Sequence, residues 1–173
     1  MKLYAFNGFR YSIRPRMERS KVPKIIEVEY PYKNNWRASD ADEFSKSIVE
    51  PCYVFGFSDG AEMAARLAAI NPNVKAAFIH SINVVNIKVQ QHVQLFCYGT
   101  AADRTGTYGR TVDFFNRQTC PKLLASLLAE TFKPPATKFE IRFMRPLCHQ
   151  FHNCLEYHLP IDIERMLKNG IGL

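Results

Sequence analysis

A serine between two glycines is the strongest chemical signal in this sequence. Residues 56–60 read G-F-S-D-G and join an apolar run, Tyr53–Phe57, to a strongly helical run, Asp59–Ile70. Between a strand and a helix, this G-x-S-x-G pattern predicts a nucleophile elbow, a turn so sharp that the serine hydroxyl projects from it. The glycines are required because a Cβ two residues from the serine would collide with a neighbouring strand or helix. Ser58 is therefore the candidate nucleophile, and a turn without chemistry is the alternative.

The motif lies in an alternating series of predicted strands and helices. The predicted strands are mostly continuous apolar runs, as expected when both sheet faces are covered. They are Lys2–Phe6, Ile25–Glu29, Tyr53–Phe57, Val74–His80, Val93–Tyr98 and Lys138–Met144. The predicted helices run from Ser39 or Asp40 to about Val49, and over Asp59–Ile70, Thr107–Arg117, Lys122–Thr131 and Ile161–Lys168. This alternation predicts an α/β fold with a doubly wound, mostly parallel sheet of about six strands flanked by helices, in a single domain over residues 1–173.

Composition and charge narrow the classes of function. The 173 residues are 47% hydrophobic and 23% charged, and no apolar run approaches the ~20 residues of a membrane span. The five cysteines show no C-x-x-C spacing, and Cys52 and Cys97 lie in predicted buried strands. We expect a cytoplasmic protein with no cofactor and no metal site, whose oligomeric state the sequence does not predict.

The net charge of +7 is concentrated in the first connection, between Arg10 and Lys24. Such a run can attract an acidic partner or nucleic acid, but it is more often a solvated face. Signatures of RNA-recognition domains and zinc fingers are absent from the sequence, so nucleic-acid binding is not expected.

The order of strand, motif serine, later acid and final histidine resembles the α/β-hydrolase family. The resemblance covers nearly the whole chain, in a minimal form with no room for a lid between Val74 and Val93. Residues 148–153, C-H-Q-F-H-N, are similar to the G-H-x-F-x-N around the family's catalytic histidine, with Cys148 in place of glycine. The resemblance implies a serine hydrolase that cleaves a small carboxylic ester or thioester through an acyl-enzyme on Ser58.

Several histidines compete for the role of general base. The base must follow the last predicted strand closely enough to reach the serine, and His149 is the first histidine after it. His152 is the alternative, whereas His158 is disfavoured because Leu159 and Pro160 already lead into the last predicted helix. His80 is expected to be structural or to line the pocket.

The base needs a carboxylate that accepts its Nδ1–H and stabilises the imidazolium. Asp103 follows the predicted strand Val93–Tyr98, and residues 99–103 are similar to the family's G-x-x-D loop with one extra residue. Asp103 is the predicted acid. Asp113, inside a predicted helix, is the alternative, and an ordinary loop cap is the other interpretation of Asp103.

The resemblance also implies two backbone donors for the developing oxyanion. One is the N–H of Asp59, the residue after the nucleophile. The other comes from the turn at residues 7–9, N-G-F, which is similar to the family's H-G-x turn. Phe9 is the expected donor and Gly8 the alternative. The expected substrate contacts are Gly8, Trp36, Phe57 and Phe151.

The sequence leaves a second class of function open. A catalytically weak or inactive binding module of the same fold would use its basic N-terminal connection to engage an acidic partner. The presence of all three triad residue types in the required order favours the enzyme.

Overall fold

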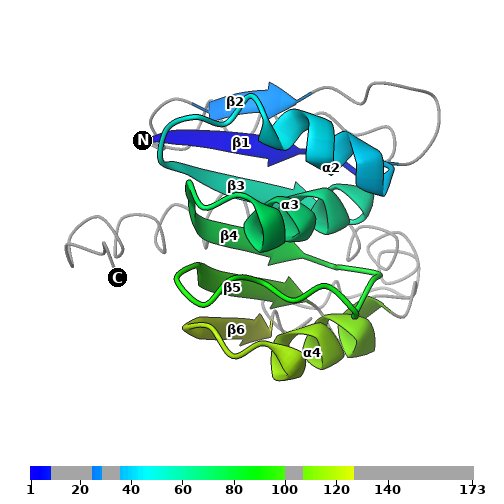
Figure 1. Ribbon diagram of the computed structural model, residues 1–173. Helices are drawn as coiled ribbons and strands as arrows, with labels where there is room; N and C mark the ends of the chain where they lie inside the picture. The colour runs from blue at the N-terminus through cyan, green and yellow to red at the C-terminus, as the bar shows by residue number, and fades with distance from the viewer. Residues whose placement is uncertain (9–24, 29–35, 100–106, 127–173) are drawn as a thin grey trace, which may run out of the picture.

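The computed structural model describes residues 1–8, 25–28, 36–99 and 107–126. Within them, six parallel strands form one sheet in the order β2-β1-β3-β4-β5-β6 (Figure 1). The strands are β1 (Lys2–Phe6), β2 (Ile25–Val28), β3 (Cys52–Phe57), β4 (Val74–His80), β5 (Gln94–Gly99) and β6 (Lys122–Ser126). The helices are α2 (Ala38–Ser45), α3 (Asp59–Ile70) and α4 (Thr107–Arg117). The predicted α/β class and parallel sheet are confirmed.

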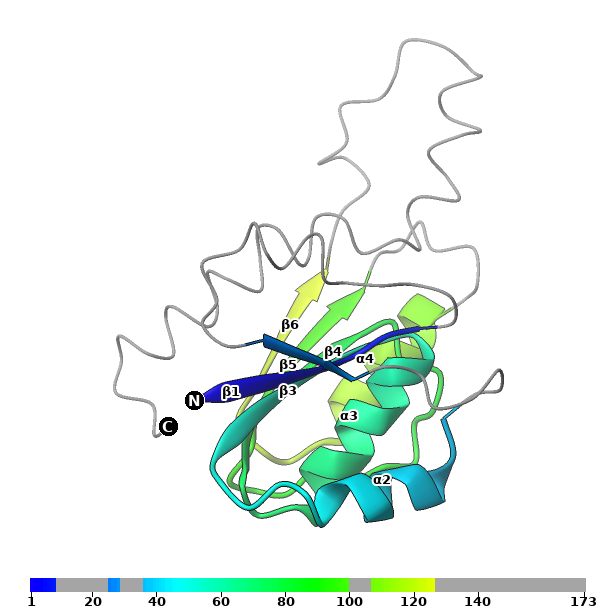
Figure 2. The same ribbon diagram turned by 90° about the horizontal axis from the view of Figure 1, so that it is seen from above.

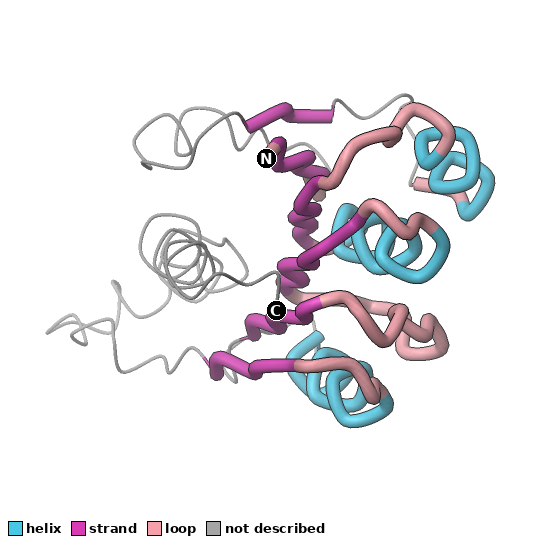
Figure 3. Tube along the Cα trace, turned by 60° about the vertical axis from the view of Figure 1, so that its left-hand side comes forward, coloured by secondary structure: helices cyan, strands magenta, loops and turns pink. Residues whose placement is uncertain are grey.

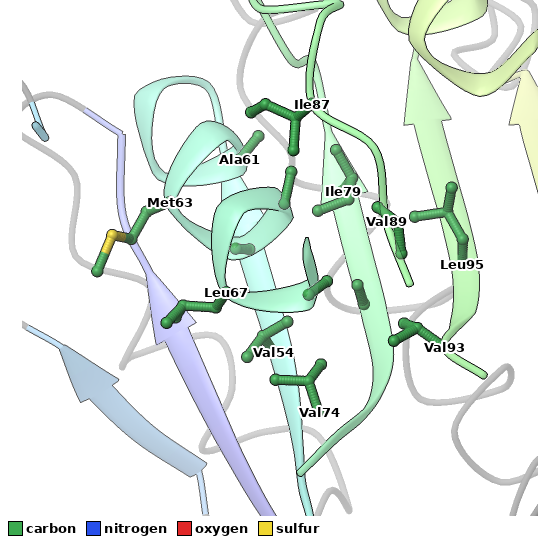
Figure 4. Close-up of a cluster of buried hydrophobic side chains, with 14 of the residues drawn as sticks. Val54, Ala61, Met63, Leu67, Val74, Ile79, Ile87, Val89, Val93 and Leu95 are labelled. Carbon is green, nitrogen blue, oxygen red and sulfur yellow. The ribbon is translucent and has the colours of Figure 1, made fainter. Parts of the chain in front are cut away.

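The three helices lie on the same side of the sheet (Figure 2 and Figure 3). Alternate strand side chains enter the apolar cluster on this side, where they meet buried residues of α3. Figure 4 shows part of this cluster, including Val54, Val74, Ile79, Leu95, Ala61 and Leu67. Because the strand side chains and the helix side chains are removed from water together, this cluster supplies a main driving force for holding α3 on the sheet.

The opposite side of the central strands carries aromatic side chains that are also buried. Tyr53 and Phe55 of β3 are 5% and 0% exposed, and Phe78 and Phe96 lie on the next two strands. The Phe78 and Phe96 rings stack with centroids 4.9 Å apart. Both faces of β3, β4 and β5 are therefore buried, which explains why these strands appear in the sequence as continuous apolar runs.

Helix α3 packs very closely on the sheet. Its buried face is made largely of alanines, whose small side chains let the helix backbone approach the strands; they are Ala61, Ala64, Ala65 and Ala68. The helix ends at the C-cap Asn71, one residue before Pro72, as the sequence predicts.

Residues 81–93, which connect β4 to β5, contain no helix. Ile82, Ile87 and Val89 anchor this segment in the core, with at most 9% of each exposed. The buried side chain of Gln118 replaces the hydrogen bonds that a helix would provide: its Nε2 donates to the carbonyl of Ile87 and its Oε1 accepts from the N–H of Val89, each at 2.9 Å. A connection this short, without a helix, is what the sequence predicts between these two strands.

One predicted helix is wrong. Residues 122–131 are rich in leucine and alanine, which favour helices, but Lys122–Ser126 is strand β6. It pairs in parallel with β5, and the N–H of Leu95 donates to the carbonyl of Pro121 at 2.9 Å. The unpaired edge of β5 offers a row of backbone donors and acceptors that β6 satisfies, and this tertiary demand overrides the local propensity.

Helix α2 is shorter than predicted. It starts at Ala38, where the carboxylate of Asp40 accepts a hydrogen bond from the N–H of Arg37 at 2.7 Å, and it ends at Ser45 rather than near Val49. At this end the carbonyl of Ser45 accepts two hydrogen bonds, from the N–H of Ile48 at 3.1 Å and from the side-chain Nδ2 of the buried Asn71 at 2.8 Å. The bond from Asn71 ties the end of α2 to the end of α3.

The other described elements agree with the predicted ones to within one residue at each end. The predicted strand Lys138–Met144 and the predicted helix Ile161–Lys168 lie outside the described residues, so the single domain over residues 1–173 stays a prediction. Among the described helices, none has the length and apolarity that crossing a membrane would require.

The cysteines of the described residues, Cys52, Cys97 and Cys120, are free and buried, as expected for the two predicted to lie in strands. Burial raises the pKa of the Cys52 thiol to about 11, against a smaller opposite effect of Lys75 and Lys2. At neutral pH this thiol is protonated and packs as a small apolar side chain.

Candidate active site

The strand order creates a switch point between β1 and β3. The chain leaves β1 toward β2 on one side and leaves β3 toward β4 on the other (Figure 1). In open α/β sheets, ligands bind beyond the carboxyl ends of strands at such a point, because the connections diverge there. Residues 7 and 8 follow β1, and Ser58 follows β3. The motif serine therefore lies where this topology favours a binding site.

Ser58 has an unusual backbone conformation. Its φ is 54° and its ψ is −118°, and it is one of only two non-glycine residues with positive φ in the described part of the chain. Its N–H donates to the carbonyl of His80 at 3.0 Å, and its own carbonyl accepts from the N–H of Ala61 at 2.9 Å. Such a conformation costs about 1–3 kcal/mol, so the surrounding structure must enforce it.

The two glycines of the motif show how the turn is enforced. A Cβ on Gly56 would lie 2.6 Å from the Cα of Ala61 and closer still to the carbonyl of Gly60. A Cβ on Gly60 would lie 2.7 Å from the carbonyl oxygen of Asn7. The absence of a Cβ at Gly56 lets β3 lie against the start of α3. The absence of a Cβ at Gly60 lets α3 lie against the residues at the end of β1. The steric reason predicted for the glycines is confirmed.

The serine hydroxyl is not used to cap the helix that it precedes. An N-cap serine ordinarily accepts a hydrogen bond from a backbone N–H of the first turn, but the Ser58 side chain makes none. Ser58 and Asp59 are both partly exposed. The first-turn N–H groups of α3 and the positive end of its dipole favour negative charge beside this serine.

The turn after β1 lies directly against Ser58. A Cβ on Gly8 would be 3.0 Å from the Cβ of Ser58 and 3.0 Å from Cδ1 of Phe57. Trp36 joins the same region, because its Nε1–H donates to the carbonyl of Asn7 at 3.3 Å. The structure thus brings together four predicted positions, Gly8, Trp36, Phe57 and Ser58.

Three buried rings lie side by side on neighbouring strands, beginning with Phe57, the residue before Ser58. The rings of Phe57 and His80 have centroids 5.2 Å apart, and those of His80 and Tyr98 are 6.4 Å apart and stacked. His80 is 1% exposed and therefore belongs to the packed interior. Ser81 follows it with φ 56°, 0% exposure and no hydrogen-bond partner for its Oγ.

Several predicted site residues lie outside the described residues. They are Phe9, Asp103, His149, Phe151 and the alternatives His152 and His158. Asp113, the alternative acid, is exposed in the middle of α4. His92 is exposed, as expected of a surface residue, and its Nε2 lies 3.1 Å from the carbonyl of Val74.

Sequence reasoning missed Glu27, whose carboxylate accepts a hydrogen bond from Nδ2 of Asn7. Nothing local points to this contact, because the two residues meet only through the parallel pairing of β1 with β2. Within the described ranges, no group of three His, Cys, Asp or Glu side chains is arranged to hold a metal ion.

The strain at Ser58 can be measured as stability. In Ser58→Gly, the removal of Cβ relieves about 1–3 kcal/mol of strain in the folded protein. Glycine also raises the conformational entropy of the unfolded chain, which lowers the stability by about 0.4–1 kcal/mol. We expect a net gain of about 1 kcal/mol in the free energy of unfolding by urea denaturation, and no comparable gain in Ser58→Ala, which keeps Cβ. Ser39→Gly, in helix α2, is the control and should lose about 0.5–1 kcal/mol. A Ser58→Gly protein less stable than Ser58→Ala would show that the turn is unstrained.

Comparisons with known proteins give a consistent fold. No family model and no curated protein matches the sequence. Among solved structures, a thioesterase of the prodiginine pathway of Streptomyces coelicolor, RedJ, matches with TM-score 0.60 and 12% identity over 85% of this chain and 89% of its own. The esterase domain of a Rhodothermus marinus protein matches with TM-score 0.56 and 12% identity over 73% and 76%. A Bacillus cereus carboxylesterase matches with TM-score 0.51 and 15% identity over 84% and 85%. With its parallel sheet and these structural neighbours, the protein has the α/β-hydrolase fold.

Proposed function

We propose that the protein is a serine hydrolase that cleaves a small carboxylic ester or thioester through an acyl-enzyme on Ser58. The observation that carries the proposal is the turn itself: a partly exposed serine with φ 54° at the N-terminus of α3, pressed into place by two glycines. Strained residues of this kind cluster at active sites. The structural neighbours that are named as a thioesterase and a carboxylesterase support the same class of reaction.

In the proposed reaction, the Ser58 Oγ attacks the carbonyl carbon while His149 takes its proton. The oxyanion of the tetrahedral intermediate is stabilised by the N–H of Asp59 and by that of Phe9 or Gly8. Collapse of the intermediate expels the alcohol or thiol, which receives the proton from His149. Water, activated by the same histidine, then attacks the acyl-enzyme and releases the acid and free Ser58.

The position of β5 supports Asp103 as the residue that orients the histidine. β5 ends at Gly99, on the same edge of the sheet as Ser58, and Asp103 is four residues further along the chain. The alternative, Asp113, is exposed in the middle of α4, and α4 packs on the face of the sheet rather than at this edge (Figure 3).

An activity-based probe tests the function. A fluorophosphonate should label the wild-type protein once, and mass spectrometry should place the adduct on the peptide that contains Ser58. Ser58→Ala should not be labelled. A folded wild-type protein without labelling would overturn the proposal and leave a binding module with an acidic partner, for which the basic run between Arg10 and Lys24 lies outside the described residues.

The short connection at residues 81–93 leads to a prediction about substrate size. Because it contains no helix that could serve as a lid, we propose a shallow site that excludes water poorly and suits small or activated acyl groups. Hydrolysis of p-nitrophenyl acetate and butyrate should exceed that of the palmitate in kcat/KM. The rate should not jump when a triglyceride forms an emulsion. A strong preference for long chains with such a jump would contradict the prediction and indicate a mobile cover.

A further inference from the structure

The turn that follows β1 is held by side chains from two other parts of the chain. Asn7 is 6% exposed, and its side-chain Nδ2 donates to Oε1 of Glu27 on the neighbouring strand β2. A carboxylate accepts hydrogen bonds and does not donate them, so this contact sets which way the Asn7 amide faces. The Asn7 Oδ1 is buried without a hydrogen-bond partner. The amide orientation is therefore kept at the expense of one unsatisfied acceptor, which costs about 1–3 kcal/mol.

The backbone carbonyl of Asn7 is held as well. Trp36 Nε1–H donates to it at 3.3 Å, and the Trp36 ring packs edge-on against Phe6 with centroids 5.7 Å apart. On another side, the carbonyl approaches α3 so closely that a Cβ on Gly60 would lie 2.7 Å from it. Side chain and carbonyl of the same residue are thus fixed by independent contacts.

Fixing this carbonyl also fixes a donor. The peptide between Asn7 and Gly8 is planar, and no described peptide is cis, so the direction of the Asn7 carbonyl determines the direction of the Gly8 N–H. A Cβ on Gly8 would meet the Cβ of Ser58 at 3.0 Å, which places this peptide beside the nucleophile. The N–H of Gly8 is one of the two alternatives for the second oxyanion donor in the proposed function, and it is the one that this peptide directs.

We propose that Asn7, Glu27 and Trp36 form a brace that orients the oxyanion-binding turn. These three are positioning residues: they hold the donor and do not touch the reacting atoms. The inference rests on the proposed function. Oxyanion stabilisation depends on donors that are already aimed before charge develops, so a loosened brace lowers the rate of the chemical step and leaves substrate binding unchanged.

Substitutions that remove one hydrogen bond at a time test the brace. Trp36→Phe keeps an aromatic ring against Phe6 and removes the Nε1–H donor. Glu27→Leu removes the acceptor for Asn7, whereas Glu27→Gln keeps an amide oxygen at the same place. Loss of a whole oxyanion donor costs about 10²–10³ in kcat, so we expect a misaimed donor to cost about tenfold to a hundredfold in kcat in both variants. In Glu27→Leu, KM should change less than twofold; Trp36 is also an expected substrate contact, so KM of Trp36→Phe is not used as a criterion. Glu27→Gln should stay within about threefold of wild type, because it restores the hydrogen bond.

Binding of a trifluoromethyl ketone, which forms a tetrahedral adduct with the serine, gives a second measurement. Its affinity should fall in parallel with kcat in Trp36→Phe and Glu27→Leu. Phe44→Leu is the matched control, because Phe44 packs on the same Phe6 ring, with centroids 5.3 Å apart, but is not part of the brace. This control should lower the thermal midpoint and leave kcat and ketone affinity unchanged.

The possible outcomes separate the two proposals. If wild type is labelled at Ser58 and active, but the brace variants keep wild-type kcat and ketone affinity, the brace is overturned and the proposed function stands. A fall in kcat that Phe44→Leu shares in proportion to its lost stability would likewise overturn the brace. A folded wild-type protein that neither hydrolyses esters nor reacts with fluorophosphonate would overturn the proposed function and, with it, the brace.

Discussion

Ser58→Ala is expected to lower ester hydrolysis by about 10⁶ and to abolish fluorophosphonate labelling. Loss of a triad nucleophile typically has an effect of this size, because the acyl-enzyme route is lost and only the oxyanion donors and substrate binding remain. The protein should stay folded, because alanine keeps the Cβ and Ser58 makes no side-chain capping hydrogen bond that the variant would lose. The measurements are kcat/KM on p-nitrophenyl acetate and the circular dichroism spectrum.

Ser81→Ala is the matched control for this experiment. Ser81 also follows a parallel strand and also has positive φ, at 56°, but it is fully buried. A general effect of replacing a strained serine at this edge of the sheet would appear in both variants, whereas loss of the nucleophile would appear only in Ser58→Ala. Undiminished hydrolysis or labelling in Ser58→Ala would refute the assignment.

His149→Ala is expected to be about as damaging as Ser58→Ala, and the double variant should be barely worse than either single one. The reason is that triad members act as a unit: once the base is absent, the hydroxyl is not activated, and removal of the hydroxyl has little further effect. The measurement is kcat for the two single variants and the double variant with the same short-chain ester. Multiplicative losses in the double variant would show that the two residues act independently.

His152→Ala discriminates between the two candidate bases. It should keep most of the activity if His149 is the base. The variant is a matched control for His149→Ala, because both remove an imidazole from the same short segment. The reverse ranking would show that the base lies three residues further along the chain. In that case the similarity of residues 148–153 to the family's histidine motif would have been aligned incorrectly.

The sequence alone determined the elements whose local and tertiary requirements agree. Helix α3 was predicted over the residues that form it, because apolar periodicity, the alanine-rich face and Asn71-Pro72 all favour the same limits. The core strands β3, β4 and β5 were predicted to within one residue, because strands buried on both faces appear as continuous apolar runs. The steric role of Gly56 and Gly60 is also predictable from the sequence, because a Cβ at either glycine of the motif would collide with a neighbouring strand or helix.

Only the tertiary structure decided the features that depend on residues distant in sequence. Lys122–Ser126 has helix-forming composition, and it is a strand because the edge of β5 offers unpaired backbone groups. Helix α2 ends at Ser45, whose carbonyl accepts a hydrogen bond from Asn71, 26 residues further along the chain. The contact between Asn7 and Glu27 follows from the pairing of β1 with β2, which no local pattern specifies. Short-range periodicity reports which side chains share a face, whereas a hydrogen bond between strands depends on register and strand order, and these are set when the whole sheet assembles.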